Sequence, residues 1–168
     1  MPLLRSDRAR EWVVGAIDRA LTKHNVALWA WCIMPTHMHI LVYPRDSKAV
    51  SPNMSAFLQS VKQSVSRKAA AWTREHAPEF LPKLIETRSD GTTCVRFWES
   101  GGGFDRNLWS AKAIWEMIDY IHRNPVEAKL CALSIGWEWS SAADYANVRK
   151  GKLKLDLRTL PPDSRKRR

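Results

Sequence analysis

The stretch that decides the fold spans residues 26–43 and reads VALWAWCIMPTHMHILVY. Its first eight residues, 26–33, are all apolar, as is typical of a strand buried on both faces. Pro35 and Thr36 interrupt this run, and residues 37–43 then alternate in the manner of a second strand. One face of that strand carries His37, His39 and Leu41, and the other carries Met38, Ile40 and Val42. We therefore expect an antiparallel pair of strands joined by a short turn.

Helices are predicted on either side of this pair in the chain. Ser6 and Asp7 are typical of a helix start, and apolar residues at helical spacing continue to about Lys23. A second amphipathic helix is predicted over about 53–75. A third begins near Ser110 and runs to about residue 123. Pro125 leaves open whether this helix ends there or continues to about residue 130.

The remaining segments complete an α+β prediction. Residues 77–93 are expected to be mostly loop, residues 94–98 a short strand, and residues 100–103 a glycine-rich turn. Helices packed on one face of the antiparallel strands would form a sandwich. We expect the catalytic domain to span residues 1–148, followed by a basic, mobile tail over 149–168.

Composition favours a polyanionic partner. Lys and Arg number 27 against 17 acidic residues, so the net charge is +10, and nucleic acid is the commonest cellular polyanion. A membrane surface is disfavoured, because no basic amphipathic anchor and no run of roughly 20 apolar residues is present. Three cysteines without CxxC spacing argue against a disulfide framework and against thiolate zinc, and they fit a reducing cytoplasm.

Two histidines and a tyrosine are the candidate reactive residues. His37 and His39 leave the same side of a strand, close enough to share one metal ion, although two unrelated histidines would give the same pattern. On the third helix, Tyr120 and Asn124 lie one turn apart, away from the stripe of Ile114, Ile118 and Ile121. An exposed tyrosine with no special role is the alternative. His122 lies nearer the apolar stripe, and we expect it to be structural.

Together these groups suit phosphodiester chemistry. A divalent ion on the histidines would polarise the phosphate, and the tyrosine oxygen would displace one side of it to leave a covalent phosphotyrosine. Basic residues would hold the strand by its phosphates. Lys62 and Arg67 on the second helix, and Arg96 and Arg106 beside the glycine turn, are the candidates. Ordinary solvated surface charge is the alternative explanation for all four.

Several motifs now point to a family. Residues 34–41 (MPTHMHIL) resemble the His-hydrophobic-His signature of single-tyrosine HUH transposases. Residues 120–126 (YIHRNPV), followed by Ala128 and Leu130, resemble the tyrosine-helix signature of the REP-associated tyrosine transposase branch. Residues 97–107 and 137–145 are also similar to that branch. The resemblance extends over roughly residues 5–147.

The resemblance implies a ferredoxin-like palm, Mg²⁺ or Mn²⁺, and DNA transposition through cleavage and rejoining of single-stranded DNA hairpins by a 5′-phosphotyrosine. It makes His37 and His39 metal ligands, Tyr120 the nucleophile and Asn124 a third ligand. It also implies a bacterial, nucleoid-associated protein, either a monomer or a homodimer. Lys129 stands where this branch usually has glycine. The branch also has a strand before the first helix, and this chain begins almost at that helix, so either the true start lies upstream or the sheet lacks this strand.

Two other functions remain open from the sequence. A hairpin-binding protein that does not cut DNA would keep the basic surface without forming a covalent adduct. A metal-dependent hydrolytic nuclease would cleave DNA even with Tyr120 replaced by phenylalanine.

Overall fold

The structure is a computed structural model that describes residues 3–45, 54–87, 90–98, 105–163 and 165. The glycine turn predicted at residues 100–103 lies outside the described residues. No helix in the described part of the chain has the length and apolar character that crossing a bilayer requires.

A two-stranded antiparallel hairpin forms the centre of the fold. β1 (Val26–Ile33) pairs with β2 (Met38–Pro44), with Cys32 opposite His39 and an irregularity between Leu28 and Ala30. All eight residues of β1 are buried, because protein covers both of its faces. This confirms the buried strand and the antiparallel pairing expected from the sequence.

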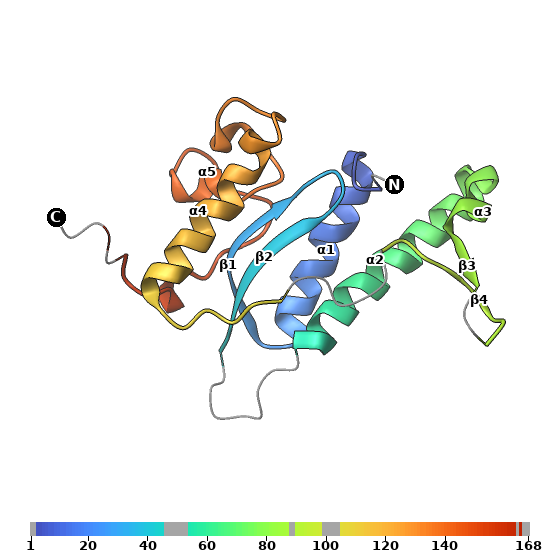
Figure 1. The fold of residues 1–168 in the computed structure, drawn as a ribbon, viewed down its shortest axis with the longest axis horizontal. Coiled ribbons are helices and arrows are strands. Elements are labelled where there is room, and N and C mark those ends of the chain that lie inside the picture. The colour runs from blue at the N-terminus through green and yellow to red at the C-terminus, as the bar shows by residue number, and fades with distance from the viewer. Residues whose placement is uncertain (1–2, 46–53, 88–89, 99–104, 164, 166–168) are drawn as a thin grey trace.

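Helices cover both faces of the hairpin (Figure 1). α1 (Asp7–Lys23) packs beside α2 (Met54–His76), and these two share a core with β2 residues such as Met38 and Ile40. α4 (Ala111–Glu127) packs on the opposite face, where Ile118 joins Trp29 and Cys32. The α+β architecture is therefore confirmed. The expectation that helices cover only one face is corrected, because β1 is apolar on both.

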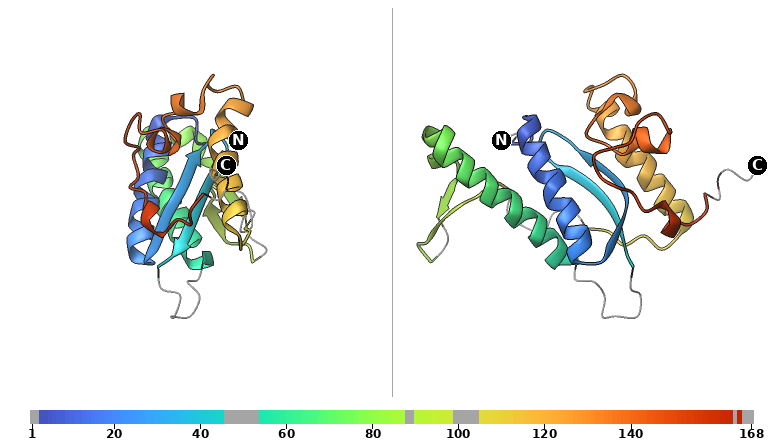
Figure 2. Two further views of the ribbon diagram at one scale, coloured as in Figure 1. Left: turned by 90° about the vertical axis from the view of Figure 1, so that its left-hand side faces the viewer. Right: turned by 180° about the vertical axis from the view of Figure 1, so that it is seen from behind.

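Residues 77–93 contain more regular structure than the sequence suggested. Short helical turns, η1 (Pro78–Phe80) and α3 (Leu81–Leu84), lead into β3 (Ile85–Thr87), which pairs with β4 (Thr93–Val95). The predicted strand over 94–98 ends at Val95. Three-residue strands show too little alternation to be detected, so only their pairing defines them. Figure 1 and the right view of Figure 2 show this β3–β4 arm beside the end of α2, away from α4.

α4 continues through Pro125, which settles the alternative left open by the sequence. The Ser110 hydroxyl caps its first turn by accepting from the amide of Ala113 at 3.1 Å. The helix ends at Glu127 with Ala128 as its C-cap, and Lys129 follows with a φ of +57°, in the left-handed region. Tyr120 and Asn124 therefore belong to one continuous helix.

The C-terminal segment borders the outer edge of β1. The amide of Ile33 donates to Trp139, the amide of Ser141 to Trp31, and the amide of Asp156 to the carbonyl of Leu28 at 2.9 Å. η2 (Ser134–Gly136), α5 (Ala142–Tyr145) and η3 (Leu157–Thr159) are the helical turns of this region. Bonds of this kind satisfy backbone groups that a strand edge would otherwise expose.

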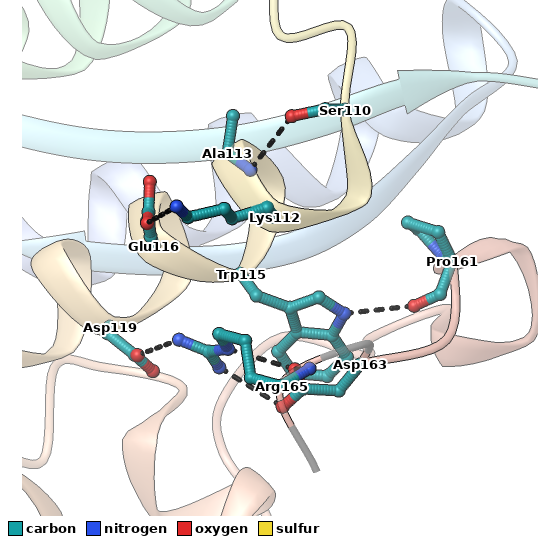
Figure 3. A network of polar contacts seen from close by, with 9 residues as sticks. All are labelled: Ser110, Lys112, Ala113, Trp115, Glu116, Asp119, Pro161, Asp163 and Arg165. Carbon is teal, nitrogen blue, oxygen red and sulfur yellow. Dashed lines mark hydrogen bonds and ion pairs between the residues drawn. The ribbon is translucent and has the colours of Figure 1, made fainter. Parts of the chain in front are cut away.

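Residues 149–163 differ from the mobile tail expected from composition. Leu153 is 2% exposed within the core shared by α1 and α2, and Asp156 pairs with Arg45. Further along, the indole of Trp115 donates to the Pro161 carbonyl at 3.0 Å, and Arg165 pairs with Asp119 on α4 (Figure 3). A few apolar and paired residues are enough to hold a segment that is basic on average. A catalytic role for residues 1–148 stays a prediction.

Candidate metal and nucleophile site

Alternation along β2 points two imidazoles to the α4 side of the hairpin. Met38 and Ile40 enter the core beneath α1 and α2, so His37 and His39 must face the other way. The Nε2 atoms of the two histidines are 3.0 Å apart, and the rings meet edge to face. The structure thus brings the predicted pair together, with the two Nε2 atoms within hydrogen-bonding distance of each other.

The surroundings of both imidazoles favour the neutral form. His37 lies at the surface and His39 is half-buried, and the surrounding protein still withdraws enough water to lower the pKa of both. The neighbouring His37 lowers the pKa of His39 further, whereas a hydrogen bond with the Asn124 side chain raises it. Neutral imidazole is the form that binds a metal ion.

Thr36 is a neighbour that sequence reasoning missed. Its hydroxyl lies 2.9 Å from Nδ1 of His37. When the Thr36 hydroxyl accepts from the Nδ1–H of His37, the Nε2 atom of His37 keeps its lone pair on the side of His39. An outer partner orients a metal-binding histidine in this way. A threonine immediately before a His-x-His pair is the sequence signal that would have identified it.

Tyr120 approaches this pair from α4. Its ring centroid is 5.5 Å from that of His39, and the side chain is 42% exposed, which leaves it accessible to a substrate. Asn124 lies one turn further along and donates from Nδ2 to the Tyr120 carbonyl at 2.7 Å. The Asn124 side chain also forms a hydrogen bond with His39. The four predicted residues therefore meet at one place.

The two neighbouring imidazoles could each supply one nitrogen ligand to a divalent ion. Within the described residues no three His, Cys, Asp or Glu side chains form a metal-binding group. A third protein ligand at this place would therefore be the Asn124 oxygen, a type of ligand that suits Mg²⁺ or Mn²⁺.

His122 belongs to the structural interior, as expected. It is 8% exposed, and its Nε2 lies 2.9 Å from the Ser141 hydroxyl. Its ring packs against that of Tyr145 at 5.0 Å. Burial lowers the pKa of His122 to about 4, so it is neutral near neutral pH.

The four predicted DNA-contacting cations are dispersed. Lys62 and Arg67 lie on α2, across the hairpin from the histidines, and the Lys62 carbonyl accepts from the Trp98 indole. Arg96 follows β4 and pairs with Glu86. Arg106 is exposed in the segment that leads to α4. The structure does not gather these side chains at the histidine pair, and their contact with DNA stays a prediction.

Comparison with known proteins finds one kind of fold. No protein-family model matches the sequence, and no curated protein matches it. The fold is similar to a solved structure of a REP-associated tyrosine transposase bound to a REP hairpin, with a TM-score of 0.53 and 18% sequence identity. The match covers 92% of this chain and 82% of that chain. The resemblance noted in the sequence is therefore confirmed for the fold.

Proposed function

We propose that this protein cleaves and rejoins single-stranded DNA at hairpins through a covalent bond to Tyr120. The observation that carries the proposal is the meeting of His37, His39, Asn124 and Tyr120, which come from a strand and a helix about 80 residues apart in the sequence. The similarity to a hairpin-bound REP-associated tyrosine transposase supports the choice of substrate. The hairpin β1–β2 would then be part of a ferredoxin-like palm.

Each residue has one task in the proposed reaction. His37, His39 and Asn124 would hold Mg²⁺ or Mn²⁺, which when bound would polarise the phosphate and offset its developing charge. The Tyr120 oxygen forms a bond to phosphorus as the bond from phosphorus to the 3′ oxygen breaks. The phenolic proton passes to solvent and the leaving 3′ oxygen takes one up. The reverse step rejoins the strand, because the phosphotyrosine keeps the ester bond.

The surface also suits an unpaired DNA strand. The net charge of +10 attracts phosphates, and Trp109, just before α4, is 90% exposed. Its neighbour Leu108 packs into the core near β1, so the extended backbone turns the indole outward. Exposed aromatic rings stack on unpaired bases with little regard to sequence. We infer that Trp109 contributes affinity for the single strand.

An adduct assay tests this function. Labelled hairpins with single-stranded flanks, taken from the DNA adjoining the gene, would be incubated with the protein and Mn²⁺ and run on a denaturing gel. We expect a protein–DNA adduct that disappears with a chelator and in Tyr120→Phe, and that persists in Tyr43→Phe as a matched control. Tyr43 lies on the same strand as the histidines but stacks on Trp29.

The other outcomes separate the remaining functions. Cleavage that survives Tyr120→Phe would identify a hydrolytic nuclease, because no protein nucleophile would then be required. Tight, hairpin-selective binding without any adduct would identify a DNA-binding protein without cleavage activity.

A further inference from the structure

A cleft opens beside the candidate site, on the side away from Tyr120. It has a volume of about 310 Å³ and lies between the N-terminal turn, the β1–β2 turn and the β3–β4 arm. The lining combines apolar side chains, such as Leu4 and Phe97, with an aromatic ring, Trp98. Lys83 and the ion pair of Arg96 with Glu86 complete it. Apolar and aromatic surface of this kind suits a nucleobase.

The cleft and the site share one residue, Thr36. Thr36 lines the cleft, and its hydroxyl lies 2.9 Å from Nδ1 of His37. From there the contacts run in order: His37 to His39 at 3.0 Å between Nε2 atoms, and His39 to Tyr120 at 5.5 Å between rings. Figure 1 and the right view of Figure 2 show α4 on one side of the β1–β2 hairpin and the β3–β4 arm on the other.

This order has a stereochemical consequence for a strand cut at the site. In phosphoryl transfer the attacking and leaving oxygens lie roughly in line, on opposite sides of the phosphorus. For a strand held with its 3′ side at Thr36, Tyr120 would attack from the α4 side and the 3′ oxygen would leave toward the cleft. The nucleotide that carries this oxygen is the one immediately 5′ of the cleaved bond.

We propose that the cleft between Thr36, Trp98 and the β3–β4 arm binds the unpaired base of the nucleotide immediately 5′ of the cleavage position. This inference rests on the proposed function and adds a positioning role for this arm. The Trp98 indole donates to the Lys62 carbonyl at 3.1 Å, so its ring is fixed before DNA binds. A fixed ring loses little entropy when a base packs against it. The arm therefore contributes to the choice of cleavage position.

Ile85 allows a test that leaves the core intact. Its side chain lines the cleft and is 48% exposed, so Ile85→Trp would fill the cleft without displacing buried groups. Ile85→Val keeps the cleft open. Val148→Trp adds an indole at a position 64% exposed near α5, outside the cleft, and controls for a new surface aromatic residue. Thermal melting of each variant would verify folding.

The experiment is an abasic scan of the hairpin substrate, one position at a time, with the wild-type protein and each variant. Adduct formation would be measured with Mn²⁺, and binding would be measured for Tyr120→Phe protein in chelator. For the wild type, an abasic site immediately 5′ of the cleaved bond should lower both about tenfold, as expected for loss of a stacked base. For Ile85→Trp, adduct formation and binding should both be low with the intact strand. The abasic site immediately 5′ of the cleaved bond should lower neither of them further.

Two results would overturn the cleft assignment. One is a wild-type protein that tolerates an abasic site at that position. The other is an Ile85→Trp variant as sensitive to it as the wild type and Val148→Trp. Failure of the proposed function would look different: no adduct would form on any strand. In that case the binding scan still tests the cleft assignment. If the cleft binds a base, an abasic site at one position must weaken binding, and Ile85→Trp must abolish that effect.

Discussion

At the scale of single residues, the candidate site depends on side chains that orient the histidines as much as on the histidines themselves. The Thr36 hydroxyl contacts Nδ1 of His37. Such outer contacts fix which ring nitrogen carries the proton, and their loss typically weakens metal affinity by about 10- to 100-fold. The tautomer of His37 therefore depends on Thr36, and this dependence can be tested without changing either histidine.

We expect Thr36→Val to raise the Mn²⁺ concentration needed for half-maximal adduct formation by about tenfold. Thr36→Ser keeps a hydroxyl and should restore the wild-type requirement. Thr22→Val removes a hydroxyl on α1 that contacts the Asp18 carbonyl, and it serves as a distant control. A metal titration of adduct formation checks this. An unchanged requirement in Thr36→Val would show that the contact does not orient His37.

Lys129 gives a prediction about stability. Its φ of +57° places a side chain in the left-handed region, where residues other than glycine cost about 1 kcal/mol. Lys129→Gly should therefore raise the free energy of unfolding by about 1 kcal/mol. Lys129→Ala removes the charge and keeps the strain, so its stability should equal that of the wild type. Urea unfolding measures both, and equal gains in the two variants would instead point to charge.

His122 makes stability depend on pH. Burial lowers its pKa in the folded protein to about 4, from about 6.5 when unfolded, so between these values only the unfolded chain takes up the proton. The contribution of neutral His122 is complete above pH 6.5 and is lost as the pH falls toward 4. The loss amounts to roughly 3 kcal/mol.

The measurement is urea unfolding at pH 7 and pH 4.5 for the wild type, His122→Asn and His76→Gln. His76 is exposed at the end of α2, so His76→Gln should keep the wild-type dependence. His122→Asn should be less stable at pH 7 and lose less on acidification. The same loss in His122→Asn as in the wild type would show that other groups cause it.

At the scale of elements, α4 links the site to the C-terminal segment. Tyr120 follows Asp119, which pairs with Arg165, and Trp115 one turn earlier donates to the Pro161 carbonyl (Figure 3). Arg165 also pairs with Asp163, within the same segment. The helix that carries Tyr120 is thus held against the hairpin by Ile118 and Ile121 on one side and by this segment on another.

The C-terminal segment should contribute to folding through Leu153. This residue is 2% exposed in the core, so Leu153→Ala should destabilise the protein by about 2–4 kcal/mol. Leu157 lies in the same segment and is 44% exposed, and Leu157→Ala should cost well under 1 kcal/mol. Chemical unfolding distinguishes the two. Similar small losses in both variants would indicate that the segment detaches in solution.

At the scale of the whole molecule, charge governs association with DNA. A protein that neutralises phosphates releases counterions, so its affinity falls as salt rises, by about 0.7 in logarithmic slope for each contact to a single strand. The net charge of +10 is a sum over the whole sequence, and only cations that touch phosphate enter this slope. The salt slope of binding therefore reports the number of cations that contact phosphate, which the net charge does not give.

Arg106 is an exposed cation shortly before Trp109, and we expect Arg106→Gln to lower the salt slope of hairpin binding by about 0.7. Arg19→Gln makes the same change of charge on α1, where Arg19 contacts Ser64 on α2, and should leave the slope unchanged. Binding of labelled hairpins at several salt concentrations provides the slopes. Equal slopes for all three proteins would remove Arg106 from the DNA-contacting surface.

Local sequence determined the elements and the pairs of residues within them. The apolar run of β1, the alternation of β2 and the helical spacing of α1, α2 and α4 each depend on neighbours a few residues apart. The same periodicities placed His37 beside His39 and Tyr120 beside Asn124. The resemblance to transposases added their expected roles.

The tertiary structure decided what lies next to what. Nothing local in β2 or α4 shows that Tyr120 meets His39, because that contact depends on both faces of β1 being covered. The pairing of β3 with β4 and the cleft beside Thr36 likewise join segments far apart in the chain. The packed segment around Leu153 depends on a single apolar residue finding a distant core, and average composition does not record such a contact.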